Sequence, residues 1–191
     1  MSKLGERNID SIMVERIKER GREREPEETL YDFNYRFRQD YLRKRREGEI
    51  VLRGRDRSWQ ESRQGLHKWF CNVKFWDQQA VPYWSMFIIR IKNHSGKHVH
   101  QGGLGLYVLE GKGYTVVDGV RYDWEKDDVI ILPVKPEGCE HQHFNADPNG
   151  PPVEWIAFIF NPFSEAMGHP LEQKEDAPEW KGSTVPTRHV T

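Results

Sequence analysis

The sequence predicts an all-β fold, a sandwich or barrel, with a helical extension before it. Short runs of strand-forming residues, separated by Gly, Asp, Asn and Pro, fill residues 65–163. Within one of these runs, the pair Asp118-Gly119 favours a tight hairpin, because both residue types tolerate the positive φ values of such a turn. Residues 1–64 are strongly charged, and their apolar residues recur at helical intervals. We therefore expect a helical extension at 1–64, one β core at 65–163 and a tail at 164–191.

Two amphipathic helices are expected in the N-terminal extension. Apolar residues between Ile9 and Ile17 mark the first. The second is predicted to begin near Pro26 and to end at Gly48, since Pro suits a first helical turn and Gly a helix end. Acidic residues crowd the same segment, so we interpret its basic run as cations at the negative helix end rather than as a nucleic-acid patch. The apolar stripe of this helix is Leu30, Phe33, Phe37 and Tyr41, and its basic run is Arg43, Lys44, Arg45 and Arg46.

Six runs within residues 65–163 carry the strand pattern. The fourth run contains the expected hairpin, and the third run precedes it. The spacing of all six runs is typical of a sandwich or a barrel. The runs are LHKWFCNVKFW, YWSMFIIRI, LGLYVLEG, YTVVDGVRYDW, DVIILP and VEWIAFIF.

Composition gives no reason to expect a nucleic-acid or membrane partner. The formal net charge is -1, and no segment has the long apolar run of a secretory signal or of a membrane span. Cys71 and Cys139 are the only cysteines, and one potential bridge is not a disulfide framework. We therefore expect a cytoplasmic protein that binds neither nucleic acid nor membrane.

Four of the eight histidines form two HxH units in the β region, His98-Val99-His100 and His141-Gln142-His143. Residues two apart in a strand face the same side, so each unit can direct two imidazoles at one point. A single unit is also compatible with two histidines that only fill the core or face solvent. Two such units, in strands joined through a hairpin, instead indicate a metal site. His67, His169 and His189 are expected to lie outside it.

The residues around these units resemble two motifs of the cupin family. The stretch HVHQGGLGLYVLEGKGYTVVDG is similar to the first motif, an HxH followed after a fixed gap by a glycine, here Gly111. The resemblance covers roughly residues 84–163 and implies a double-stranded β-helix, the jelly-roll barrel of cupins. In DDVIILPVKPEGCEHQHFN, the second motif PxGxxHxxxN is matched by Pro136, Gly138, His141 and Asn145.

The resemblance also identifies a branch of the family. The common cupin site adds a glutamate to three histidines, and at its expected place this chain has Leu104. The gentisate and salicylate dioxygenases also lack that glutamate and bind iron with three histidines. This implies that His98, His100 and His141 hold the metal, while His143 stands where it can contact substrate. The titration range of histidine also suits His143 to take a phenolic proton and return it, unless the residue only fills a core position. Because the loop before His141 is longer than in the family, the choice between His141 and His143 as third ligand stays open.

Three neutral ligands leave the charge of a divalent ion unbalanced and leave three coordination positions free on a six-coordinate ion. This suits a chelating phenolic anion together with O2. We expect Fe(II), with Mn(II) and Zn(II) as alternatives, since three histidines and a water are also a catalytic zinc arrangement.

The expected substrate contacts are fewer. In the dioxygenase branch an arginine grips the substrate carboxylate, and at its place this chain has Leu106, which argues against gentisate itself. Arg90 is a candidate replacement, unless it is a surface strand residue, and Gln101 is a candidate polar contact. The glycines around Leu104 either open space for a planar ring beside it or accommodate a backbone bulge.

The sequence thus predicts an Fe(II)-dependent dioxygenase that cleaves the ring of a small phenolic compound. Two alternatives remain, a metallo-cupin without oxygen chemistry, such as an isomerase or lyase on a sugar or small acid, and a non-catalytic ligand-binding cupin. A homodimer or larger homo-oligomer is expected, because small open-edged barrels often bury an edge between subunits.

Overall fold

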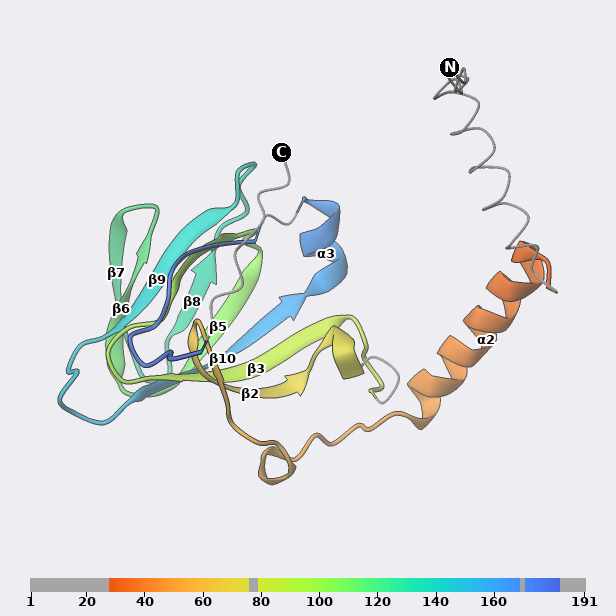
Figure 1. Cartoon of the computed structure of the whole chain (residues 1–191), viewed down its shortest axis with the longest axis horizontal. Helices are drawn as coiled ribbons and strands as arrows, with labels where there is room; N and C mark the ends of the chain where they lie inside the picture. The colour runs from red at the N-terminus through yellow and green to blue at the C-terminus, as the bar shows by residue number, and fades with distance from the viewer. Residues whose placement is uncertain (1–27, 76–78, 169–170, 183–191) are drawn as a thin grey trace, which may run out of the picture. The chain divides into compact units, whose positions relative to one another are not determined.

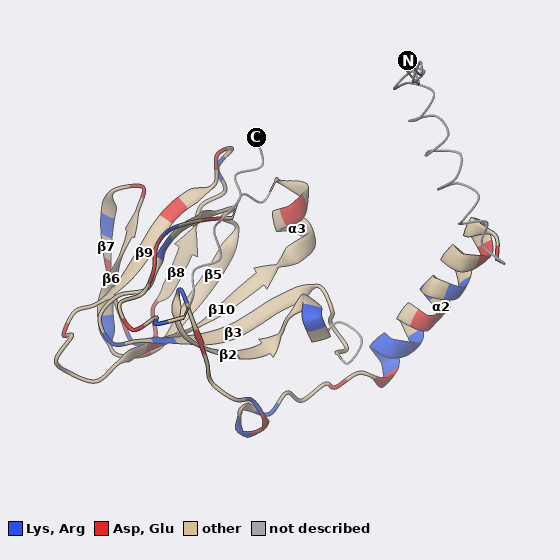
Figure 2. Ribbon diagram, in the orientation of Figure 1, with Lys and Arg blue, Asp and Glu red and all other residues tan. Residues whose placement is uncertain are grey.

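A computed structural model describes residues 28–75, 79–168 and 171–182. The chain divides into two units, Met1–Arg43 and Lys44–Thr191. The first expected helix lies outside the described residues. The second is α2 (Leu30–Glu47), which ends where Gly48 donates its backbone N–H to the Lys44 carbonyl. Figure 2 shows the charges along α2, including the cations of its last turn. No described helix combines the length and the apolar character needed to cross a membrane.

Two antiparallel sheets make up the β region (Figure 1). In the six-stranded sheet the strand order is β1-β2-β3-β10-β5-β8, and in the five-stranded sheet it is β11-β4-β9-β6-β7. The first sheet contains β1 (Gln60–Ser62), β2 (Gly65–Cys71), β3 (Trp84–Ile91), β10 (Val153–Phe160), β5 (Leu104–Glu110) and β8 (Val129–Leu132). The second contains β11 (Glu172–Glu175), β4 (Lys97–His100), β9 (Cys139–Asn145), β6 (Lys112–Val117) and β7 (Val120–Glu125).

The core lies between the inner faces of the two sheets. In β8, Ile130 and Leu132 are buried while Val129 and Ile131 are exposed, which is the alternation expected of a strand with one face in a core. Both sheets contribute to one cluster of buried residues. It contains Ile89, Ile91, Leu104, Leu106, Val108, Ile130, Leu132, Val153, Trp155 and Ala157 from the six-stranded sheet, and Val117, Trp124 and Cys139 from the five-stranded sheet.

The structure confirms the expected hairpin and strands and extends the sheets at both ends. Asp118 and Gly119 have φ values of 48° and 83° and join β6 to β7 with Val117 opposite Val120. The sheets also include β1, before residue 65, and β11, within the segment expected to be a tail, where β11 pairs with β4. The short helix α3 (Asn161–Ala166) and the 3-10 turns η1 (Gly54–Asp56) and η2 (Val73–Phe75) were not expected.

Candidate metal centre

Three histidines on two neighbouring strands meet on the inner face of the five-stranded sheet. His98 and His100 are two apart on β4, and β4 pairs with β9 so that His98 stands opposite His141. The ring centroids lie 4.8 Å apart for His98 and His100, 4.3 Å for His98 and His141, and 4.5 Å for His100 and His141. One nitrogen from each ring lies within 4.8 Å of the others, and within the described ranges no Asp, Glu or Cys joins them.

Backbone carbonyls orient two of these rings. His100 Nδ1 lies 2.8 Å from the Gln101 carbonyl oxygen, and His141 Nδ1 lies 2.9 Å from that of Cys139. A carbonyl oxygen only accepts, so both Nδ1 atoms carry the proton and, in a neutral ring, the lone pair is on Nε2. Hydrogen bonds of this kind orient metal-binding imidazoles in proteins. The Nδ1 atom of His98 is buried, and no residue in the described part of the chain forms a hydrogen bond with it.

Two histidines of this cluster, His98 and His141, have lowered pKa values. Burial, together with the neighbouring His100 and His143, lowers the pKa of His98 to about 3. Burial and the same neighbours, with His98 added, hold the pKa of His141 well below its usual value. Neutral imidazole is the form that binds metal ions. The donor set therefore fits a divalent cation with a preference for nitrogen ligands, because three imidazoles converge with one nitrogen of each within 4.8 Å of the others.

His143 lies beside the cluster but is held differently. Its ring is 3% exposed and packs on Trp155, with ring centroids 4.7 Å apart. Its Nδ1 atom lies 2.7 Å from the hydroxyl oxygen of Thr115, which in turn accepts a 2.9 Å hydrogen bond from the indole N–H of Trp124. The ring centroids of His143 and His141 are 5.5 Å apart. Of the two histidines on β9, the one that meets His98 and His100 is therefore His141.

Comparison with known families agrees with this geometry. Residues 86–159, which include β4 to β9, match the family model described as a cupin domain. This β region is a cupin barrel. The matched segment is less than half of the chain.

Several solved structures are similar to the chain. The salicylate 1,2-dioxygenase of Pseudaminobacter salicylatoxidans is 24% identical over 54% of this chain and 29% of that chain, with a TM-score of 0.41. A cupin-like protein of Thermotoga maritima is 22% identical over 69% of this chain and 92% of that one, with a TM-score of 0.47. A Streptomyces nucleoside dehydratase is 10% identical over 67% and 92% of the two chains, also with a TM-score of 0.47. The chain spans less than a third of the length of the dioxygenase chain. A comparison with curated protein sequences gave no match.

Gln101 directly follows the first HxH in the cupin barrel, and its side chain forms hydrogen bonds with backbone groups. Its amide nitrogen donates to the Lys135 carbonyl at 2.8 Å, and its oxygen accepts from the backbone N–H groups of Gly102 and Lys135 at 2.9 and 3.1 Å. The residue is fully buried. Gln101 thus ties the end of β4 to the loop after β8, and the structure does not leave its amide free to contact a substrate.

The structure does not bring Arg90 to the histidines. On β3 its neighbours Ile89 and Ile91 point into the core, so Arg90 points to the other face of the sheet. There its guanidinium donates to Glu154 at 2.6 Å and lies 4.2 Å from the centroid of the Trp59 ring. These contacts are those of a surface strand residue, the second of the two interpretations that the sequence allowed.

Leu104 and its neighbouring glycines show why this segment is rich in small residues. Leu104 is 5% exposed and belongs to the core cluster. A Cβ atom on Gly102 would lie 1.8 Å from the Pro133 carbonyl oxygen, and one on Gly103, whose φ is +79°, would lie 2.4 Å from the Phe163 ring. Gly102 and Gly103 therefore permit a close approach of neighbouring segments. A Cβ atom on Gly105 would meet no atom within 4 Å, but Gly105 alternates with the inward-facing Leu104 and Leu106 on β5 and so faces the other side of the sheet.

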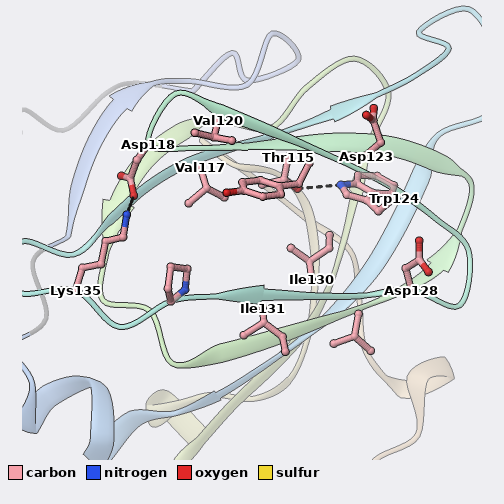
Figure 3. A pocket seen from close by; sticks show the side chains of 13 residues that line it. Thr115, Val117, Asp118, Val120, Asp123, Trp124, Asp128, Ile130, Ile131 and Lys135 are labelled. Carbon is pink, nitrogen blue, oxygen red and sulfur yellow. Dashed lines mark hydrogen bonds and ion pairs between the residues drawn. The ribbon is translucent and has the colours of Figure 1, made fainter.

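A pocket of about 630 Å³ opens between β7 and β8, the edge strands of the two sheets (Figure 3). Its walls are mainly apolar, from Val117, Val120 and Ile130, and the charged Asp118 and Lys135 at its rim pair with each other. The metal-site histidines do not line it. Thr115 lines the pocket and also contacts His143, so it separates the pocket from the histidine cluster.

Three residues near the histidines were not found from the sequence. Thr115 and Trp124 contact or support His143, and both lie at inward positions of the β6–β7 hairpin, which its alternating pattern could have indicated. His67, expected outside the site, is buried on β2 and is close enough to contribute to the lowered pKa of His98. Its ring stacks on Trp69, with centroids 5.5 Å apart. Nothing in the local sequence of β2 distinguishes His67 from a core residue.

Proposed function

We propose that this protein is an Fe(II)-dependent dioxygenase that cleaves the ring of a small phenolic or dihydroxy-aromatic compound. The observation that carries the proposal is a cluster of three imidazoles with no carboxylate among the described residues. The absence of a fourth protein ligand is the feature by which the sequence resembles the gentisate and salicylate dioxygenase branch of the cupins. Position 104, where the common cupin carboxylate is expected, holds a core leucine.

The charge of the site favours an anionic chelating ligand. Three neutral donors leave a divalent cation with its full +2 charge and with open coordination positions. A deprotonated catechol or hydroxybenzoate supplies two oxygen donors and negative charge. An iron ion held there would supply the redox chemistry through which O2 reacts with an organic substrate.

The residues of the chain have separate tasks in this proposal. His98, His100 and His141 hold the ion, and the carbonyls of Gln101 and Cys139 keep two of the rings in a fixed orientation. His143 contacts the bound substrate from the neighbouring position on the same strand. The surrounding core limits the access of water, which strengthens electrostatic interactions within the site.

The proposed choice of substrate follows from position 106, where the dioxygenase branch has an arginine and this chain has a leucine. Leu106, where the dioxygenase branch has its arginine, is 4% exposed in the core, and Arg90 is paired with Glu154 on the other face of its sheet. A carboxylate clamp by arginine is therefore not provided by either residue. We propose a catechol, a hydroquinone or a substituted hydroxybenzoate in preference to gentisate.

The test is oxygen consumption by metal-loaded protein. The protein is loaded with Fe(II) under anaerobic conditions and mixed with O2 and a panel of phenols, while oxygen uptake and the absorbance of a ring-opened product are recorded. We expect both signals with at least one phenol and neither with the His141→Ala variant. Protein that holds iron but consumes no oxygen with any phenol would contradict the proposal.

A second candidate is a metallo-cupin without oxygen chemistry, acting on a sugar or a small acid. It is favoured by the same observation, because three histidines with an open fourth position are also a catalytic arrangement for Zn(II). Elemental analysis of freshly purified protein distinguishes the candidates. Zinc in the site, with activity that persists without O2, would support this second function.

A further inference from the structure

A buried chain of hydrogen bonds runs from Trp124 through Thr115 to His143. The three residues are 6%, 0% and 3% exposed, so water does not compete for their polar groups. Trp124 Nε1 lies 2.9 Å from Thr115 Oγ1, which lies 2.7 Å from His143 Nδ1. Figure 3 shows the first of these bonds from the side of the pocket. An indole N–H can only donate, so Thr115 Oγ1 is the acceptor in that bond.

The position of the hydroxyl proton of Thr115 determines the direction of the hydrogen bond between Thr115 and His143. Among the described residues, Thr115 Oγ1 has no other hydrogen-bond partner than Trp124 and His143. If His143 Nδ1 carried a proton and donated it, the buried hydroxyl would have no acceptor, and a buried donor without an acceptor is unfavourable. The hydroxyl therefore donates to Nδ1, and this nitrogen must be unprotonated.

We propose that Thr115 and Trp124 are positioning residues that hold His143 as the tautomer protonated on Nε2, so that it donates a hydrogen bond to an anionic oxygen of the ligand at the metal centre. The tautomer follows from the protein's own hydrogen bonds. The identity of the ligand as a phenolate rests on the proposed function.

The direction of the Nε2 atom supports this role. Nδ1 faces β6, because Thr115 is the residue directly opposite His143 in the β6–β9 ladder. Nε2 is at the end of the ring farther from the backbone, on the inner side of the sheet that also carries His141. No described residue forms a hydrogen bond with it, whereas Nδ1 is engaged. The Nε2–H group is thus left for a ligand.

This assignment changes the role expected for His143. An imidazole whose basic nitrogen is bound by a hydroxyl and whose other nitrogen carries a proton cannot take a phenolic proton at that other nitrogen. It can instead stabilise negative charge that is already present on a ligand oxygen. His141, two residues earlier, has the opposite tautomer, because a carbonyl accepts from its Nδ1.

The tautomer can be measured without turnover. The protein is labelled with ¹⁵N-histidine and loaded with Zn(II), and the His143 signals are assigned by their absence in the His143→Gln variant. We expect a protonated Nε2 and an unprotonated Nδ1 in the unchanged protein. Thr115→Val, which is nearly isosteric but has no hydroxyl, should move the two nitrogen shifts toward each other. Thr115→Ser, which keeps the hydroxyl, should leave them as they are.

The second measurement concerns the ligand. Binding of 4-nitrocatechol to the Zn(II)-loaded protein is followed by its visible absorbance. Thr115→Val should weaken binding by roughly 10-fold, the effect of losing one hydrogen bond to a charged group. Thr115→Ser should restore it, and the zinc content should be equal in all three proteins.

The outcomes separate this inference from the proposed function. A protonated Nδ1 in the unchanged protein overturns the inference, and so does a Thr115→Val protein with unaltered shifts and binding. The spectrum of the unchanged protein decides the tautomer even if the valine variant fails to fold. An Nε2–H tautomer in a protein that shows no oxygen uptake would leave the inference intact and contradict the dioxygenase.

Discussion

His141 and His143 stand two residues apart on β9 and face the same interior, yet their rings have different partners. A backbone carbonyl orients His141 toward the two histidines of β4, whereas the hydroxyl of Thr115 holds His143 from β6. Proximity of sequence therefore does not give them the same chemistry. The hydrogen bond on Nδ1 decides which nitrogen of each ring carries the proton, and hence whether Nε2 can bind a cation or donate a hydrogen bond.

This difference predicts that two matched substitutions change the metal affinity by very different amounts. His141→Ala should lower metal affinity by more than the roughly 10–100-fold that the loss of an outer hydrogen-bond partner costs, because it removes a ligand. His143→Ala should change the affinity by about 10-fold or less. Both residues are buried on the same strand, so each controls for the cavity made by the other. Metal content after dialysis against a weak chelator measures the effect, and equal loss in both variants would contradict the ligand assignment.

His67 predicts a pH dependence of stability. Burial lowers its pKa to about 4 from 6.5, against a smaller opposite effect of the Gly65 carbonyl. Below pH 6.5 the unfolded chain therefore binds a proton that the folded protein does not. The contribution of neutral His67 to stability is complete above pH 6.5 and is lost as the pH falls toward 4, by about 3 kcal/mol in total.

The measurement is urea unfolding of the unchanged protein and of the His67→Phe variant at a series of pH values from about 7.5 to about 4.5. This range spans most of the interval between the ordinary and the lowered histidine pKa. Chelator is present throughout, so that metal release does not contribute. The difference in unfolding free energy between the two proteins should shift in favour of the variant as the pH falls. A difference that is constant across this range would show that His67 is not held neutral by the fold.

At the scale of elements, the β6–β7 hairpin places Thr115 and Trp124 against each other. Its turn requires positive φ at both Asp118 and Gly119, the geometry that matches the twist of the flanking strands. The strands pair in register from Val117–Val120 to Lys112–Glu125. A change in that register would exchange the inward and outward faces and remove Thr115 from His143.

Substitution of Gly119 tests this turn, with Gly105 on β5 as the control. A Cβ atom on Gly119 would meet no atom within 4 Å, so Gly119→Ala carries only the backbone penalty of its φ of +83°. We expect a loss of about 1 kcal/mol in the free energy of unfolding. Gly105→Ala on β5 also meets no atom within 4 Å and has no positive φ, so it should be neutral or slightly stabilising. Equal effects of the two substitutions on urea unfolding would contradict the strain at the turn.

At the scale of the whole molecule, the metal centre joins two separate parts of the chain. His98 and His100 precede most of the barrel, and His141 follows the β6–β7 hairpin and β8. The unfolded chain does not hold these rings together, so a metal ion that binds them stabilises the folded state. The size of the effect depends on the free metal concentration relative to the dissociation constant.

Metal removal should therefore lower the melting temperature. At a free concentration about 100 times the dissociation constant, binding adds about 2.7 kcal/mol to the free energy of unfolding. Thermal unfolding in chelator, and again after addition of Fe(II), Mn(II) or Zn(II), measures this shift. The His141→Ala variant should show little response to any of the ions. A melting temperature of the unchanged protein that is independent of metal would argue against a metal site at these histidines.

The sequence by itself determined most of the strands, the hairpin turn and the two HxH units, but not β1 and β11. These are local features, since a period of two residues, an Asp-Gly pair and the spacing of two histidines are written within a few positions. It also indicated that the helix predicted to begin near Pro26 would end at Gly48, and α2 ends one residue earlier, at Glu47. Even β9, whose HQH core is short of apolar residues, could be placed through its histidines.

Only the tertiary structure decided what the site residues contact. Three contacts depend on strand order and register: His98 stands opposite His141, Thr115 contacts His143, and Arg90 forms an ion pair with Glu154. Gln101 is likewise occupied by Lys135, 34 residues away. These partners are set by long-range pairing of the backbone, in which a shift of one residue reverses every side chain. Local sequence therefore specified which residues face inward, while their hydrogen-bond partners arose only from the assembled sheets.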